Sequence, residues 1–139
     1  MIADQPQPTV SQVAGLKVRH VALGSGPPVV VLPGWGAYIE AVMPIGRALQ
    51  AEHTVHLIDL PGFGQSQEPP EPWSAEDYRE FVIAFMDQFG IQQADLVGHS
   101  HGGRTAISLA ATYPERLGKL ILIDSAGLKP KRGLGYYWR

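Results

Sequence analysis

The sequence of 139 residues contains no cysteine, no long apolar run and no excess of one charge. The lack of cysteine excludes disulfides, thiolate nucleophiles and cysteine-based zinc sites. Eleven basic and thirteen acidic residues give a net charge of −2 without a run of one sign, so neither nucleic acid nor an anionic membrane is expected as a partner. The N-terminus has neither the basic start nor the apolar stretch of a secretory signal, which predicts a cytoplasmic location.

The composition is that of an ordinary globular chain, with 45% hydrophobic and 17% charged residues. A chain of this length can build one compact core, which predicts a single domain. Residues 1–8 contain two prolines and two glutamines and are expected to be disordered. The domain is therefore predicted to span residues 9–139.

Two kinds of strand are predicted. The runs TVSQV at 9–13 and LKVRHVAL at 16–23 are β-rich and separated by a glycine, which indicates an antiparallel hairpin. Four apolar runs then end in turns of small residues, as buried strands of a parallel sheet do. These runs are VVVLPGWG at 29–36, TVHLIDLPGFG at 54–64, ADLVGHS at 94–100 and KLILIDSAG at 119–127.

Helices are predicted between the buried strands. One begins after Ser74, with Asp77 placed as in a capping box and apolar residues at helical spacing from Tyr78 to Phe89. A second is expected at 42–51, with Pro44 in its first turn and its inward face formed by Ile45, Ala48 and Leu49. A third follows the serine at position 100 and ends before the proline at position 114. Alternating strands and helices predict an α/β fold.

The stretch VGHSHGG at 97–103 holds a Gly-x-Ser-x-Gly motif around Ser100. By chance alone, such a match arises in roughly one sequence in ten of this composition, so the motif needs its context. Ser100 follows an apolar strand and precedes a helix, which is the setting of a nucleophile elbow. The alternative is a glycine-rich turn in which Ser100 only caps the helix.

With these motifs in order, the sequence resembles the α/β-hydrolase family, in particular its serine-nucleophile, esterase- and lipase-like members. LPGWG resembles the oxyanion loop, DLPGFGQS the turn after the next strand, GHSHGG the elbow, and LILIDSAG the strand that follows. The resemblance covers the N-terminal half of such a protein. It implies a mostly parallel sheet preceded by an antiparallel hairpin, with helices on both faces and with the later strands and the lid missing.

The resemblance also assigns site residues. It implies that Ser100 is the nucleophile and that the backbone N–H groups of Trp35 and His101 form the oxyanion hole. Pro33 stands where many members have histidine, which leaves a backbone donor at Trp35 in place. Asp124 ends the strand after the elbow, where some members carry the triad acid, although an aspartate that caps a turn is the competing interpretation. Asp59, at the end of another strand, is expected to shape the site.

A histidine base is missing from the predicted triad. The family order is nucleophile, acid and then histidine, but the only histidine after Ser100 is His101. Neighbouring helical residues point about 100° apart, so the ring at 101 is poorly placed to take the serine proton. His20, His53 and His56 precede the nucleophile and are expected to lie away from it, and His99 is expected to be packed. The activity is therefore expected to be weak or to need completion.

The leading hypothesis is a serine hydrolase acting on a small carboxylic ester or a related acyl substrate. The alternative is a non-catalytic, hydrolase-like fragment that binds a partner. Nucleotide binding is a weaker third hypothesis, because the glycine-rich segment Gly24-Ser25-Gly26 precedes its strand, whereas a phosphate-binding turn follows one. No metal-ligand spacing occurs, and neither a metal nor a cofactor is expected. The apolar strand near 119–124 would leave an open sheet edge, which together with the aromatic residues 136–138 predicts a homo-oligomer or a partner that covers the edge.

Overall fold

The structure is a computed structural model that describes residues 5–129. Its elements follow one another along the chain, with residues 5–8 in neither a helix nor a strand. They are β1 (Thr9–Val13), β2 (Leu16–Leu23), β3 (Pro28–Leu32), α1 (Ile39–Leu49), β4 (Thr54–Ile58), α2 (Ala75–Gln88), β5 (Ala94–His99), α3 (His101–Thr112), a short 3-10 turn (Pro114–Arg116) and β6 (Leu117–Ile123).

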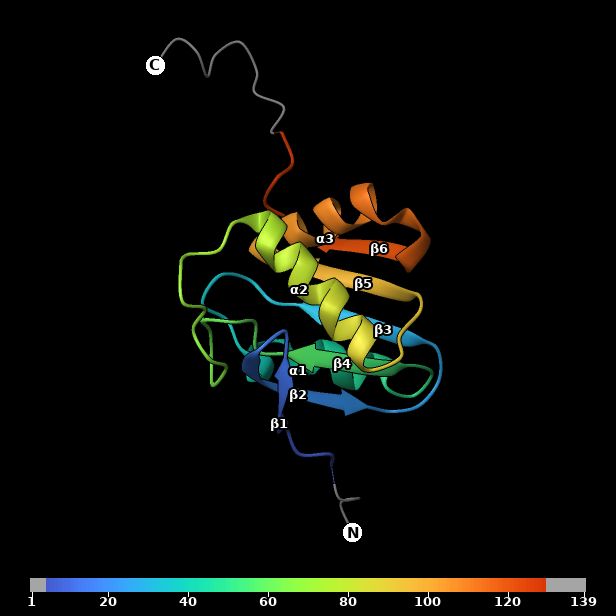
Figure 1. Cartoon of the computed structure of the whole chain (residues 1–139). Helices are drawn as coiled ribbons and strands as arrows, with labels where there is room; N and C mark the ends of the chain where they lie inside the picture. The colour runs from blue at the N-terminus through green and yellow to red at the C-terminus, as the bar shows by residue number, and fades with distance from the viewer. Residues whose placement is uncertain (1–4, 130–139) are drawn as a thin grey trace, which may run out of the picture.

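The strands form one sheet in the order β1-β2-β4-β3-β5-β6 (Figure 1). β1 and β2 form the predicted antiparallel hairpin, and β2 joins β4 in antiparallel register. β3 pairs in parallel with both β4 and β5, and β5 pairs in parallel with β6. The prediction of an α/β fold with a mostly parallel sheet after a hairpin is confirmed.

Helices cover both faces of the sheet (Figure 1). On one face, α1 packs on a buried cluster that includes Val31, Leu57 and Val97. On the other, α2 and α3 pack on a larger cluster that includes Phe81, Phe85 and Leu96. Each strand of the sheet's centre thus sends alternate side chains into two separate apolar layers, which is how a buried parallel sheet is stabilised.

The capping box predicted for α2 is present. The Asp77 N–H donates to Ser74 Oγ (3.2 Å), and the Ser74 N–H donates to Asp77 Oδ2 (2.7 Å). The apolar stripe from Tyr78 to Met86 is buried, whereas Phe89 caps the C-terminus and stays 37% exposed. Residues within the first turn of α2 therefore determine where this helix begins.

The predicted bounds and inward face of α1 are wrong in part. The helix begins at Ile39, three residues before the expected start, and its buried residues are Ile39, Val42 and Gly46. Ala48, which was expected to face inward, is exposed. The early start has a tertiary cause, because the Ile39 N–H donates to a carboxylate oxygen of Asp59 (2.7 Å), twenty residues along the chain.

The last of the four predicted buried strands lies at the sheet edge. Within residues 5–129, β6 pairs only with β5, and Ile121 and Ile123 stay 42% and 38% exposed. Their side of the sheet has an apolar groove of about 450 Å³, whose lining residues are Pro44, Ile45, Ala48, Leu49, Val97, Ile121 and Ile123. Burial on both faces was the wrong expectation, because no described helix covers β6 on the α1 side.

The oligomer or edge-covering partner predicted from the sequence stays a prediction. An apolar edge strand with unpaired backbone groups is a template for another strand. We expect light scattering at micromolar concentration to give a mass above that of one chain, and an Ile121→Lys/Ile123→Lys variant to shift the mass toward the monomer. A monomer mass for the unmodified chain would contradict this prediction. The aromatic residues 136–138, which also motivated it, lie outside the described residues.

In the part of the chain that the structure describes, no helix is long and apolar enough to cross a membrane.

Candidate active site

Ser100 lies in a sharp turn between β5 and α3, as the sequence predicts. Its backbone has a φ of 51° and a ψ of −114°, which is rarely adopted by a residue other than glycine. Such a conformation costs on the order of 1–3 kcal/mol and persists only where the surrounding structure enforces it. Here the Ser100 N–H donates to the Ile123 carbonyl (3.1 Å), and its own carbonyl accepts from Ala126 (2.9 Å). The turn is thus tied to the end of β6.

The glycines of the motif permit the close approach of strand and helix. A Cβ atom at position 98 would lie 2.5 Å from the Gly103 Cα atom, and one at position 102 would overlap the Leu32 carbonyl. Neither neighbour is a flexible side chain, so a larger residue would force the backbone apart. The Gly-x-Ser-x-Gly pattern therefore has a packing reason here, beyond the helix cap that was the alternative interpretation.

The loop after β3 lies against the Ser100 turn. A Cβ atom at Gly34 would contact the Ser100 Cβ atom (3.4 Å) and the His99 ring (3.1 Å). The next residue is Trp35, whose side chain is 68% exposed. Within residues 5–129, the backbone N–H groups of Trp35 and His101 have no hydrogen-bond acceptor. Two free donors thus flank Ser100, one from the loop and one from the start of α3.

The His101 ring packs among aromatic side chains. It makes edge contacts with the rings of Trp35 (5.1 Å between centroids) and Tyr78 (5.2 Å). Its Nε2 atom is buried without a partner, and desolvation, helped by the charge of Arg104, lowers the pKa of His101. No described side chain hydrogen-bonds the Ser100 hydroxyl. The ring of His101 is therefore neutral and held by aromatic packing.

His20 and His56 lie at the far end of α2 from Tyr78. The His20 ring packs against Phe85 and Phe89, and the His56 ring packs against Phe85. His20 also shares a hydrogen bond with Ser11 Oγ (2.8 Å). Burial lowers the pKa of both histidines, with the neighbouring charge of His20 adding to the effect on His56. Both histidine rings are therefore packed against other side chains.

These lowered pKa values predict a pH-dependent stability. An unfolded histidine takes up a proton below its ordinary pKa of 6.5, whereas His20, His56 and His101 stay neutral in the fold to a lower pH. Between the folded and the unfolded pKa values, the unfolded state thus binds more protons than the folded state. The free energy of unfolding therefore has its full value above pH 6.5 and falls as the pH drops below it. Urea unfolding at pH 7.5 and 5.5 measures this loss.

The control for this pH dependence is a His20→Gln/His56→Gln variant. Because glutamine does not titrate, the difference between the two pH values should shrink in this variant. Equal stability of the unmodified chain at pH 7.5 and 5.5 would contradict the prediction.

Asp124 directly follows β6 at the same sheet edge as Ser100. It is exposed and has a φ of 42°, a left-handed conformation that aspartate tolerates in turns. The structure brings it near the elbow through the bond between the Ser100 N–H and the Ile123 carbonyl. No described histidine hydrogen-bonds Asp124. Its assignment as the triad acid therefore stays a prediction beside its role in the turn.

Asp59 is fully buried at the end of β4 and connects three segments. Its carboxylate accepts from the Ile39 N–H (2.7 Å) at the start of α1 and from the Gln65 N–H (2.9 Å), and it pairs with Arg19 (3.2 Å). Glu40 accepts from both Nη atoms of the same guanidinium and shares Nη1 with Asp59. These contacts hold the start of α1, which follows the Trp35 loop, and the turn after β4. That Asp59 shapes the site stays a prediction.

An aromatic pocket that Trp35 lines was not predicted from the sequence. The cavity has a volume of about 340 Å³. Its lining residues are Trp35, Gly62, Phe63, Glu68, Pro69, Pro70, Glu71, Pro72, Trp73 and Tyr78. The available signal was the aromatic pair that flanks a proline-rich segment, Phe63 and Trp73, but only the folded connection between β4 and α2 brings these rings together.

Residues 5–129 hold no group of three or more histidine, aspartate or glutamate side chains that could bind a metal ion.

Together, the mostly parallel sheet and the strained serine in a tight turn between strand and helix define an α/β protein with the strand-turn-helix arrangement of the Gly-x-Ser-x-Gly motif. A family profile described as the alpha/beta hydrolase fold matches residues 27–137. The chain belongs to the α/β-hydrolase family.

Similar proteins carry out several reactions. The chain is 36% identical to the dihydrolipoyllysine-residue acetyltransferase component of the acetoin cleaving system of Pseudomonas putida, over 91% of this chain and 35% of the relative. It is 41% identical to the pimeloyl-[acyl-carrier protein] methyl ester esterase of Aeromonas hydrophila, over 80% of this chain and 42% of the relative.

A solved structure of a membrane phospholipase A, described as a bacterial virulence factor, has a TM-score of 0.87 and 32% identity. The match covers 93% of this chain and 43% of that chain. The chain thus spans less than half the length of each of these relatives, which is consistent with the N-terminal portion of the fold.

Proposed function

We propose that the chain is a serine hydrolase of carboxylic esters or related acyl compounds, with Ser100 as its nucleophile. The observation that carries the proposal is the strained Ser100 turn between two unpaired backbone N–H groups, those of Trp35 and His101. Backbone donors aimed at a developing oxyanion are a large source of stabilisation in acyl transfer. Both an esterase and a phospholipase among the similar proteins act on esters, which supports this substrate class.

The first chemical step follows from these residues. The Ser100 Oγ attacks the carbonyl carbon of the ester, and the carbonyl oxygen becomes an oxyanion that accepts from the N–H groups of Trp35 and His101. The bond to the leaving oxygen then breaks, which yields an acyl-enzyme and an alcohol or phenolate. No described side chain hydrogen-bonds the Ser100 hydroxyl, so its proton passes to solvent water, and the step is slow.

Asp124 has no part in this step. We keep it as the acid for a histidine base, which the resemblance places later in the family's chain order. A complete triad would speed both acylation and deacylation, whereas the oxyanion hole and binding alone retain roughly 10³- to 10⁴-fold catalysis over water.

A burst experiment tests the proposed acylation. With p-nitrophenyl acetate, the leaving group needs no proton, so acylation proceeds without a general acid. We expect p-nitrophenolate release to show a burst approaching about one equivalent per chain, followed by a slow phase limited by deacylation. Release that is linear from the start and no faster than in buffer would contradict the proposal and favour the non-catalytic fragment.

A further inference from the structure

Four aromatic rings form the pocket, those of Trp35, Phe63, Trp73 and Tyr78. None of these side chains takes part in the proposed acylation. The Trp35 and Phe63 centroids lie 4.8 Å apart, and those of Trp73 and Tyr78 lie 5.2 Å apart, both in edge contact. Phe63 also stacks on Tyr78, at 6.3 Å. Side chains from three separate segments thus line one open pocket of about 340 Å³.

The charge around this pocket has one sign. Among residues 5–129, Glu68 and Glu71 are the only charged residues that line it, and no lysine, arginine or histidine of that range does. Within residues 5–129, neither glutamate forms a salt bridge. Two nearby arginines are engaged elsewhere, because Arg19 pairs with Asp59 and Glu40 and Arg79 pairs with Glu80.

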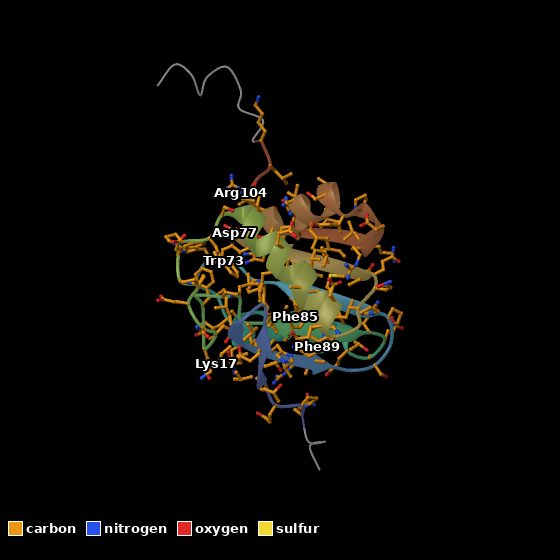
Figure 2. All side chains as sticks on the ribbon, in the orientation of Figure 1. Lys17, Trp73, Asp77, Phe85, Phe89 and Arg104 are labelled. Carbon is orange, nitrogen blue, oxygen red and sulfur yellow. The ribbon has the colours of Figure 1, made fainter. Side chains whose placement is uncertain are left out.

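Two further basic groups stand near the pocket but outside its lining. Arg104 is an exposed residue of α3 (Figure 2). It forms no salt bridge among residues 5–129. The His101 ring makes edge contacts with Trp35 and Tyr78 but does not line the pocket, and its lowered pKa keeps it neutral at pH 7. The cavity therefore presents aromatic rings and two free carboxylates to a ligand.

We propose that this pocket binds an alkylammonium or quaternary ammonium group. The faces of aromatic rings attract cations electrostatically, most strongly when the cation lies within about 6 Å of the ring centre. The carboxylates of Glu68 and Glu71 add attraction at the rim. A trimethylammonium group also has apolar methyl surfaces that suit the tryptophan and proline side chains of the lining.

The position of the pocket relates this cation to the acyl chemistry. Trp35 lines the pocket with its side chain and supplies one proposed oxyanion donor with its backbone N–H. The pocket thus adjoins the loop that carries one of the two proposed oxyanion donors. Resting on the proposed function, this placement identifies the substrate class as acyl esters that carry a cationic ammonium group.

The test compares choline with 3,3-dimethylbutanol, its neutral isostere, by isothermal titration calorimetry on the whole chain. The Ser100→Ala variant is titrated as well, because choline binding in the pocket should not depend on the Ser100 hydroxyl. We expect choline to bind with a dissociation constant about tenfold lower than that of the neutral alcohol. Equal or tighter binding of 3,3-dimethylbutanol, or no binding of choline, would overturn the proposal.

Variants locate the binding. Glu68→Gln/Glu71→Gln changes only exposed side chains and should raise the dissociation constant of choline several-fold without affecting the neutral alcohol. Trp73→Leu should weaken choline binding about tenfold, with circular dichroism confirming its fold. The matched control is Glu115→Gln, an exposed glutamate at the opposite end of the strands, which should leave choline binding unchanged. Unchanged choline binding in the double glutamine variant would contradict the proposal.

The two proposals can fail separately. Choline binding without a burst from p-nitrophenyl acetate would contradict the proposed function and support the cation pocket. A burst that depends on Ser100, without a preference for choline, would support the proposed function and overturn the cation pocket.

Discussion

Replacing Ser100 with alanine abolishes the burst of p-nitrophenolate, from about one equivalent per chain to none. The burst counts acyl groups on a nucleophile, and alanine has no oxygen to carry one. Position 100 is half-buried, and alanine fits the space of serine at the turn, so the fold should be retained. Absorbance of the released p-nitrophenolate, recorded at high chain concentration, measures the amplitude.

The amplitude of the burst is a sharper measure than the steady-state rate. The effects of removing a nucleophile and its base are not additive. Because no base is described here, replacing the serine lowers the steady-state rate less than it would in an enzyme with a complete triad. Ser25→Ala is the matched control, because Ser25 is an exposed serine in the loop between β2 and β3. A burst of equal size in Ser100→Ala would show that another group is acylated.

Replacing Asp59 with alanine lowers the free energy of unfolding by about 3–5 kcal/mol. This is the range for removing one partner of a buried ion pair, because the remaining group is left without compensation. Here the Arg19 guanidinium and the backbone N–H groups of Ile39 and Gln65 would all lose their acceptor. For a small domain with a total of about 5–15 kcal/mol, this is a large share of stability.

Glu40→Ala is the matched control for Asp59→Ala, because Glu40 binds the same arginine from an exposed position. Exposed ion pairs contribute under about 1 kcal/mol, so its effect on urea unfolding should be small. A loss of less than 1 kcal/mol in Asp59→Ala would contradict the assignment of Asp59 as the buried anchor of both loops. Loss of the burst in Asp59→Ala is expected too, since the loop that carries Trp35 leads into α1.

The parts of the fold that were predicted from the sequence are those with local causes. The Ser74 and Asp77 side chains cap α2 within its own first turn, and the stripe from Tyr78 to Met86 follows helical periodicity. The parallel strands were recognised because each apolar run ends in a turn of small residues. Long-range contacts were not recognised, and the start of α1 was misplaced because its cap comes from Asp59, on another strand.

In the site, too, the features with local causes were predicted and the long-range contacts were not. The Ser100 turn was predicted because strand, glycines and helix adjoin in the sequence. The packing of His101 between Trp35 and Tyr78 joins three elements, so spacing alone could not predict it. The exposure of Ile121 and Ile123 likewise depends on which helix covers β6, and the apolar pattern of a strand does not contain that information.

The central claim is that Ser100 reacts as a nucleophile, and covalent labelling tests it most directly. The chain is treated with a fluorophosphonate, and intact-mass spectrometry with peptide mapping then locates the adduct. We predict one adduct per folded chain, on the peptide that contains Ser100, and none on the Ser100→Ala variant or on the chain unfolded in urea. Absence of an adduct on the folded chain, or an adduct that persists in Ser100→Ala, would contradict the account.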